Sequence, residues 1–262
     1  MTQISIVTGL LCCQSLSVFL SRVIWWRLLP AINVVFSALL LIFNDSRWDY
    51  KKDTLLQNTD EYEDVDEENH LTITDILKDT SQRTYVILAI ILLASQQTSG
   101  INAILYFSNT IFSTIADTQT SKFITLGITI VNFLMTFPPI YLIQKFGKKK
   151  LLAFSFIGII GSLICLSIFI TNKPLLSAIT VYLFISFYSI GLGPLPFDIL
   201  SNLVDENSSS ALQSIGLASN WVANLLIGST FLPLTDLLNQ SLTFLLYALI
   251  SGIVLVYLLL KL

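Results

Sequence analysis

The sequence has little that could support enzymatic chemistry or metal binding. Its 262 residues include one histidine, His70, and three cysteines, and each cysteine lies inside an apolar run. These residues do not have the spacing of a metal site or of a disulfide framework. The sequence also contains no Gly-x-Ser-x-Gly motif and no pair of carboxylates inside an apolar run. These absences argue against an enzyme, and we expect neither a cofactor nor a metal ion.

Charged residues are also scarce. They make up 12% of the chain, whereas roughly a quarter of the residues of a soluble protein are charged. The hydrophobic fraction is 54% and the mean hydropathy is +0.76. We therefore predict an all-α polytopic membrane protein. The formal net charge of -3 comes from residues 44–84, which hold twelve acidic and five basic residues, so it gives no indication of a nucleic-acid partner.

Apolar runs long enough to cross a bilayer, about twenty residues each, recur along the chain. We predict eight crossings, over Ile4–Leu20, Arg27–Phe43, Tyr85–Ile115, Phe123–Ile143, Leu151–Thr171, Leu175–Val204, Leu212–Leu232 and Leu242–Leu260. The acidic segment separates the second crossing from the third. The predicted organisation is a pair of helices in residues 1–43, a loop in residues 44–84 and a six-helix bundle in residues 85–262.

Basic residues in the connections predict which helix ends face the cytoplasm. The strongest cluster, Lys145 with Lys148, Lys149 and Lys150, lies between the fourth and fifth crossings. Taking this connection as cytoplasmic, alternation places ten Lys or Arg residues on the cytoplasmic side and four on the other. The positive-inside rule therefore predicts that the acidic loop and the C-terminus are cytoplasmic.

The acidic loop divides into two parts. Residues 54–69 are too highly charged to bury a core, and we expect them to be disordered. Thr72–Gln82 carries Ile73, Ile76 and Leu77 at helical spacing. A short helix along the cytoplasmic face and an ordinary linker both fit this second part.

The third predicted crossing contains polar residues near its middle, in the sequence Gln96-Gln97-Thr98-Ser99-Gly100-Ile101-Asn102. Hydrocarbon cannot satisfy amide donors and acceptors, so these side chains must face other helices, a water-filled cavity or a polar ligand. Gly100 adds a position where the helix can break. We interpret the segment as a discontinuous helix that lines the path of a polar ligand. The alternatives are amides that only bond neighbouring helices and a glycine that only allows close packing.

Other predicted crossings also contain amides, namely Gln3, Gln14, Asn132, Asn220 and Asn224. Asn220 and Asn224 are four residues apart and share one helix face, as do Asn102 and Tyr106. An amide can both donate to and accept from a hydroxyl group, whereas an ion site requires charges or rings of carbonyl groups. The pattern therefore favours a neutral polyol as the ligand.

Prolines interrupt the sixth predicted crossing, at Gly191-Leu192-Gly193-Pro194-Leu195-Pro196-Phe197. Each proline lacks an N–H donor and disfavours helix in the residue before it, so this crossing cannot be a regular helix. Discontinuous helices near the midplane build many transporter sites, although a kink with a purely structural role is the alternative. Pro138-Pro139 predicts a similar bend in the fourth crossing.

Four motifs occur in a fixed order: Gln96–Asn102 followed by Tyr106-Phe107-Ser108, Phe146-Gly147-Lys148-Lys149, Gly193-Pro194-Leu195-Pro196, and Ser219-Asn220-Trp221 with Asn224. They resemble helix seven, the connection from helix eight to nine, helix ten and helix eleven of the sugar porter family of the major facilitator superfamily. Asn44-Asp45-Ser46-Arg47-Trp48 resembles a degraded form of that family's motif after helix six. The resemblance covers essentially the whole chain and implies an incomplete major facilitator fold, helices five to twelve of twelve.

The resemblance also implies which residues bind a sugar. By their positions in the family's motifs these are Gln3, Gln96, Gln97, Asn102, Asn132, Phe197, Trp221 and Asn224. The amides would bond hydroxyl groups, while Phe197 and Trp221 would supply apolar faces. Ser189, Asn202 and Gln144 stand where many members carry acidic residues. The resemblance therefore implies a weaker ion-pair network on the inner face. It leaves open whether the sugar is a hexose or trehalose.

Three hypotheses of function follow. The preferred one is facilitative transport of a neutral sugar by alternating access in the plasma membrane, with the sugar and the lipid bilayer as partners. The second is a transport-incompetent fragment, or an interaction partner of a full-length carrier, which needs the missing N-terminal helices or a second chain. The chain starts with an apolar run that has no basic leader, which argues against a signal peptide. A start inside a spanning helix is instead what we expect of such a fragment. The third is a channel or receptor, which predicts no saturable sugar uptake.

Overall fold

A computed structural model describes residues 73–79, 82–113, 117–171, 173–204 and 206–262, together with Thr8, Gly9, Leu11, Cys12 and Ser15. Contacts divide the chain into one compact unit of residues 1–11 and 70–262 and a second unit of residues 12–69. Nearly all of the described residues belong to the first unit. Apart from these five residues, the first two predicted crossings lie outside the described residues, as do the acidic segment 54–69 and the candidate site residue Gln3.

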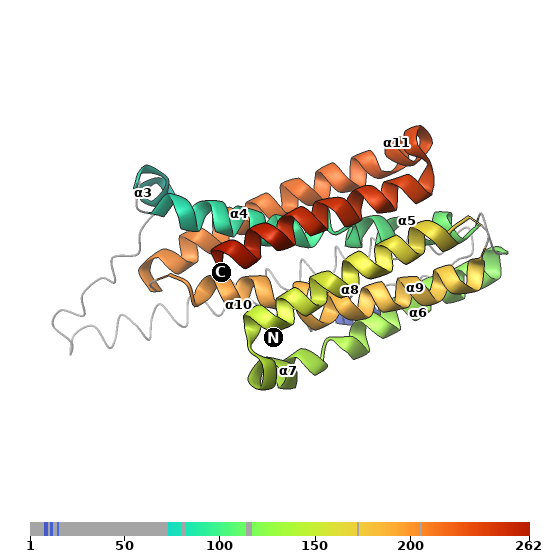
Figure 1. The fold of residues 1–262 in the computed structure, drawn as a ribbon, viewed down its shortest axis with the longest axis horizontal. Coiled ribbons are helices and arrows are strands. Elements are labelled where there is room, and N and C mark those ends of the chain that lie inside the picture. Colours follow the sequence, from blue (N-terminus) through green and yellow to red (C-terminus); the bar gives the residue numbers. More distant parts are fainter. Residues whose placement is uncertain are drawn as a thin grey trace, which may run out of the picture. The chain divides into compact units, whose positions relative to one another are not determined.

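The third predicted crossing is a broken helix, as expected from the glycine. The two parts, α4 (Arg83–Thr98) and α5 (Ile101–Ser113), are separated by Ser99 and Gly100 (Figure 1). Gly100 has a φ of 86°, in the left-handed region that favours glycine. A Cβ atom at this position would lie 2.9 Å from Tyr247 Cδ2. The break therefore requires glycine for its backbone conformation and also for the limited space.

A short helix, α3 (Ile73–Lys78), precedes α4. It lies within Thr72–Gln82, the segment for which the sequence fits either a helix or a linker. Ile76 of α3 is fully buried in an apolar cluster that includes Val86 and Leu212. The short helix is therefore part of the packed unit.

Two adjacent prolines produce the expected bend in the fourth crossing. The helices on either side of the bend, α6 (Thr118–Met135) and α7 (Pro138–Phe146), meet at 46°. Pro138 is the first residue of α7, a position where an N–H group would have no helical partner. Gly147 ends α7 with a φ of 79°, and α8 (Lys148–Phe169) begins directly after it.

The sixth crossing is irregular, as its prolines predict. The helix α9 (Pro174–Phe187) passes into a π-helix, η3 (Tyr188–Leu192), and α10 (Leu195–Ser201) follows. Pro194 and Pro196 have no N–H to donate, so regular helical bonding cannot continue through them. Gly191 allows η3 to approach α8, because a Cβ atom there would lie 2.9 Å from Leu151 O. Wide helical turns of this kind occur frequently at functional sites.

The helix α11 (Glu206–Lys261) contains the last two predicted crossings. Asn239 interrupts it with a φ of 67° and a ψ of 165°. The Oδ1 atom of Asn239 accepts a hydrogen bond from Leu242 N at 3.0 Å, the geometry of a helix N-cap. The chain therefore turns at Asn239, and Figure 1 shows the two parts of α11 side by side, in orange and red.

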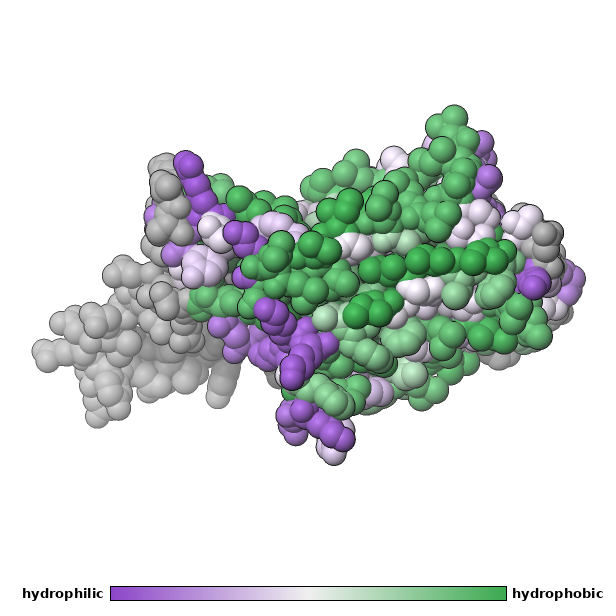
Figure 2. Space-filling model, in the orientation of Figure 1, coloured by the Kyte–Doolittle hydropathy of each residue, from purple (hydrophilic) through white to green (hydrophobic). Residues whose placement is uncertain are grey.

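The core of the first unit surrounds α8. Phe156 and Leu163 of α8 are fully buried and belong to one apolar cluster with side chains of α9, η3 and the second part of α11. Large apolar side chains also cover much of the outer surface, which is mostly green in Figure 2. Exposed examples are Ile168, Leu175, Leu225, Leu249 and Ile253. Such a continuous apolar surface suits hydrocarbon and not water.

The helix lengths fit the predicted crossings. Four helices in the described residues are long and apolar enough to cross a membrane, and the bent pair α6–α7 makes a fifth. With 56 residues, α11 is long enough for two crossings. Each of the six crossings predicted from Tyr85 onward is therefore represented by helix, and the described residues contain no strand. The predicted all-α class is confirmed.

Candidate functional site

Three buried amide side chains join α4 to the first part of α11. Gln97 Nε2 donates a hydrogen bond to Asn220 Oδ1 at 3.0 Å. Asn220 Nδ2 in turn donates to Gln96 Oε1 at 2.7 Å and to Leu93 O at 2.8 Å. The side chains of Gln96, Gln97 and Asn220 are only 6%, 8% and 7% exposed. Their mutual bonding makes this burial possible, since surrounding apolar groups offer no partners.

Gln96 also joins α4 to the irregular part of the sixth crossing. Its Nε2 atom donates to Leu192 O at 3.0 Å and to Gly193 O at 2.8 Å. In a regular helix Leu192 O would accept from the N–H of residue 196, but residue 196 is a proline. Gln96 therefore supplies a donor that the backbone of this segment lacks. Both N–H groups and the Oε1 atom of the Gln96 amide therefore bond protein groups, as expected for an amide that bonds neighbouring helices.

Asn102 extends the network across the break at Gly100. Its Nδ2 atom donates to Gln97 Oε1 at 2.6 Å, so the first turn of α5 is bonded to the last turn of α4. The Asn102 side chain is only partly buried. Within the described residues, Asn102 Oδ1 accepts no hydrogen bond. One acceptor of the network therefore remains available to another group.

A set of more exposed groups continues from this acceptor, and we call Asn102, Tyr106, Trp221 and Asn224 the polar face. Tyr106 Oη donates to Asn224 Oδ1 across a long distance of 3.4 Å, which links α5 to α11. Tyr106 and Trp221 are 57% and 63% exposed. Asn224 Nδ2 and Trp221 Nε1 donate to no group in the described part of the chain. The polar face thus combines two unused donors, one unused acceptor and two aromatic rings.

The buried amide of the fourth crossing has a separate partner. Ser189 Oγ lies 2.7 Å from Asn132 Oδ1 and 2.8 Å from Ile185 O, and it can donate to either. Asn132 and Ser189 are 4% and 1% exposed. This pair joins α6 to η3, the same irregular segment that Gln96 bonds. The Nδ2 atom of Asn132 has no partner among the described residues.

Phe197 differs from the other candidate residues. It lies on α10, is partly buried and packs against the apolar cluster that contains Ile76, Leu93 and Leu212. No hydrogen bond connects it to the amide network. The structure therefore brings Gln96, Gln97 and Asn102 together, places Asn132 on the adjoining η3 contact, and places Phe197 in an apolar cluster.

The central position of Asn220 was missed by the sequence interpretation. There Asn220 is part of the motif Ser219-Asn220-Trp221 and shares a helix face with Asn224, but it is not among the predicted site residues. In the structure its one side chain contacts three groups on α4, and it is the residue that holds Gln96 and Gln97 together. The four-residue spacing to Asn224 was the available signal, because it places both amides on the α11 face toward α4 and α5.

An ion pair lies at the end of the bundle where α7 meets α8. Lys148 Nζ is 2.9 Å from Asp198 Oδ2, with the two side chains 33% and 45% exposed. Asn202 Nδ2 also donates to Asp198 O. Gln144 stands where the resemblance implies an acidic residue. It is exposed and lies near the C-terminal end of α7, shortly before Lys148 in the sequence.

We predict a small effect when this ion pair is removed. Asp198→Asn should lower the midpoint of thermal unfolding by about 3 °C or less, because exposed ion pairs contribute about 1 kcal/mol at most. Circular dichroism in detergent measures the midpoint, with the exposed Asp236→Asn change on α11 as the matched control. A decrease of about 10 °C for Asp198→Asn alone would show that the pair carries more of the stability than its exposure suggests.

Broken membrane helices that meet around buried polar groups are common in secondary transporters. Solved structures have the same fold. The proton:xylose symporter XylE bound to 6-bromo-6-deoxy-D-glucose matches with a TM-score of 0.74 at 19% identity, over 97% of this chain and 61% of that one. The partially occluded inward-open xylose transporter XylE from E. coli matches with a TM-score of 0.73 at 17% identity, over 97% and 60%.

Residues 1–262 match the family described as "Sugar (and other) transporter", and the chain belongs to this family. It is 26% identical to the Bos taurus solute carrier family 2, facilitated glucose transporter member 4, over 95% of the chain and 55% of the relative. It is 27% identical to member 2 from Rattus norvegicus, over 97% and 54%. The chain spans about half the length of the curated relatives it matches. The sugar porter resemblance and the multi-pass membrane class are confirmed, and the relatives are transporters rather than enzymes.

Proposed function

We propose that the whole protein containing this chain moves a neutral sugar, a hexose or trehalose, across the membrane by facilitative alternating access. The observation that carries this proposal is the unused hydrogen-bonding capacity of the polar face. Within the part of the chain that the structure describes, Asn102 Oδ1 accepts no hydrogen bond and Asn224 Nδ2 and Trp221 Nε1 donate none, whereas the neighbouring amides bond one another. A partly exposed polar surface of this kind is matched by a ligand with several hydroxyl groups.

The chemistry of a sugar fits this arrangement. Each hydroxyl group both donates and accepts, so one sugar can use the free acceptor and the free donors together. The rings of Tyr106 and Trp221 offer apolar faces to the C–H groups of the sugar while keeping a polar tip for hydrogen bonding. The three amides Gln96, Gln97 and Asn220 hold α4 and α11 in register, and thereby position the polar face.

The remaining candidate residues keep narrower roles in this proposal. Asn132 offers its unpartnered Nδ2 atom from α6. Gln97 already bonds Asn220 through Nε2 and Asn102 through Oε1, so it can offer a sugar only its second N–H group and its second lone pair. Phe197 supplies an apolar surface from α10, and Gln3 contributes from the first predicted crossing.

We further propose the orientation and the location of the protein. The lysines at the junction of α7 and α8 lie at the same end of the first unit as the C-terminus (Figure 1). The positive-inside rule then assigns this end, and the acidic loop, to the cytoplasm. The plasma membrane is the proposed membrane. The breaks in α4–α5 and in α9–η3–α10 are the positions where helices change shape as access alternates.

A second candidate function is supported by how much of its relatives' length the chain spans. The chain corresponds to 55% of the Bos taurus glucose transporter and to 61% of the xylose symporter chain. Alternating access requires two bundles that rock against each other. By this proposal, the 262-residue polypeptide alone carries no sugar, and it needs further N-terminal helices or a second chain.

Tracer uptake into proteoliposomes tests both proposals. Glucose, fructose and trehalose are offered with and without a pH gradient, to the chain alone and to a polypeptide that has four further helices before it. We expect saturable uptake that does not need the pH gradient, and we expect it only from the longer polypeptide. Background uptake of every sugar by the longer polypeptide would reject sugar transport, whereas saturable uptake by the chain alone would reject the second proposal.

A further inference from the structure

A cavity at the junction of α7 and α8 lies apart from the amide network. Its volume is about 390 Å³, and it is lined by Leu142, Phe146, Lys150, Leu151 and Phe154. Four of these five residues are apolar, and the fifth carries a positive charge. A cavity with this lining suits a molecule that has an apolar chain and an anionic end.

Lysines concentrate the positive charge beside this cavity. The junction contains Lys145, Lys148, Lys149 and Lys150. Lys148 is paired with Asp198, and Lys145 Nζ lies 5.5 Å from the centre of the Phe146 ring. Lys149 and Lys150 are exposed and have no carboxylate partner in the described part of the chain. Hydrophilic residues gather at this junction in Figure 2, directly beside the apolar surface.

We propose that this cavity binds an anionic phospholipid. An acyl chain packs against Leu142, Phe146 and Phe154, and the phosphate group contacts Lys150, with Lys149 next to it. Lys149 and Lys150, which have no carboxylate partner among the described residues, provide charge complementarity that a zwitterionic lipid satisfies only in part. A soluble anion uses the lysines but leaves the apolar lining exposed, so the two kinds of surface together indicate a lipid.

The position of the cavity supports this occupant. The apolar surface of the spanning helices ends where α7 meets α8, and basic residues begin there. Lysine at such a boundary extends its apolar stem along the helix and places its charge at the level of lipid headgroups. Basic pockets between helices at this level are suited to anionic headgroups.

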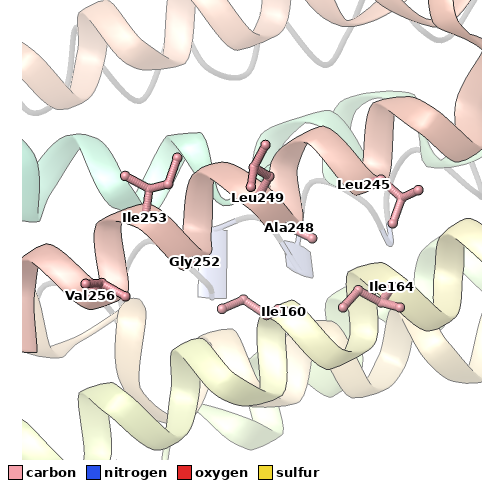
Figure 3. A pocket seen from close by; sticks show the side chains of 8 residues that line it. All are labelled: Ile160, Ile164, Leu245, Ala248, Leu249, Gly252, Ile253 and Val256. Atoms are coloured by element: carbon pink, nitrogen blue, oxygen red, sulfur yellow. The ribbon is translucent and has the colours of Figure 1, made fainter.

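A groove elsewhere in the described part of the chain has a different character. It lies between α8 and the second part of α11, and Figure 3 shows Ile160 and Ile164 facing Ala248 and Gly252 across it. All eight of the residues that line it are apolar or glycine, so it has no group that selects a headgroup. Any lipid tail fits such a surface, and we expect no preference for one lipid there.

Native mass spectrometry of the purified chain tests the proposal. The chain is titrated with phosphatidylglycerol or phosphatidylcholine that have identical acyl chains. We expect half-maximal binding of phosphatidylglycerol at about a fivefold lower concentration, the effect of one favourable lysine contact. Lys150→Gln should abolish this preference. Lys173→Gln, an exposed lysine before α9 at the opposite end of the bundle, is the matched control and should preserve it.

Two further measurements distinguish binding of a lipid from binding of a free anion. Inorganic phosphate in millimolar excess should not displace phosphatidylglycerol, and Phe154→Ala should weaken the binding of both lipids equally. Displacement by phosphate would identify a simple anion site and overturn the proposal. An unchanged lipid preference in Lys150→Gln, with the helix content of the wild type, would overturn it as well. Neither outcome depends on sugar transport.

Discussion

Replacing Gly100 by alanine is expected to lower the free energy of unfolding by about 2–5 kcal/mol. The left-handed backbone at Gly100 costs about 1–2 kcal/mol for any residue with a Cβ atom. The new methyl group also meets the Tyr247 ring, with 2.9 Å to Cδ2, and crowding in a packed core costs about 1–3 kcal/mol. Thermal unfolding followed by circular dichroism in detergent should show a midpoint lowered by about 5–12 °C.

Gly161→Ala provides the matched control for this change. Gly161 is an exposed residue in the middle of α8, and nothing lies within 4 Å of a Cβ atom placed there. Alanine favours helix over glycine by about 1 kcal/mol, so this variant should melt at or above the wild-type midpoint. Equal midpoints for the two variants would contradict the strained break between α4 and α5.

The second large effect is expected at Asn220. Asn220→Leu removes two donors and one acceptor at once. It leaves Gln97 Nε2 and Gln96 Oε1 without their partners, while Leu93 O keeps its hydrogen bond within α4. Each unsatisfied buried group costs about 1–3 kcal/mol. Rearrangement of the two glutamines recovers part of this, so we expect a loss of about 3–5 kcal/mol in stability.

Asn224→Leu separates this network effect from the general effect of placing leucine on α11. Asn224 lies one turn further along the same face, is partly exposed and has a single contact of 3.4 Å with Tyr106. Its replacement should cost about 1 kcal/mol or less in stability. If Asn220→Leu and Asn224→Leu unfold at the same midpoint, Asn220 is not the centre of the network.

The breaks in the helices were predictable because their causes are local. Gly100 supplies a backbone conformation that other residues disfavour, and Pro138, Pro194 and Pro196 remove donors from the residues around them. Each break therefore lies where the sequence places it. The N-cap at Asn239 is local in the same sense, since one side chain bonds a backbone N–H three residues away.

The pairing of the amides was not predictable in the same way. The partner of Gln96 is the backbone at Leu192 and Gly193, 96 and 97 residues further along the chain. An isolated sequence shows that an amide needs a partner, but the packing of α4 against η3 and α11 decides which one. The sequence interpretation treated the amides of the third crossing as equivalent, whereas the structure divides them by the partners available.

This division bears on the alternative that the amides only bond neighbouring helices. Gln96 and Asn220 fit that alternative, since both N–H groups and the oxygen of each amide bond protein groups. Among the described residues, by contrast, Asn102 Oδ1, Asn224 Nδ2 and the indole N–H of Trp221 have no partner. The proposed sugar site therefore depends on the polar face, and the buried amides contribute by holding it in place.

Tracer-glucose uptake by Asn102→Ala in the longer polypeptide, reconstituted in liposomes, tests this claim most directly. A site that bonds hydroxyl groups loses much of its transport when one bonding group is removed, so we predict an initial rate at least about tenfold lower at equal protein content. Gln144→Ala, which removes an exposed amide on α7, should transport like the wild type. Wild-type uptake by Asn102→Ala would contradict sugar binding at the polar face.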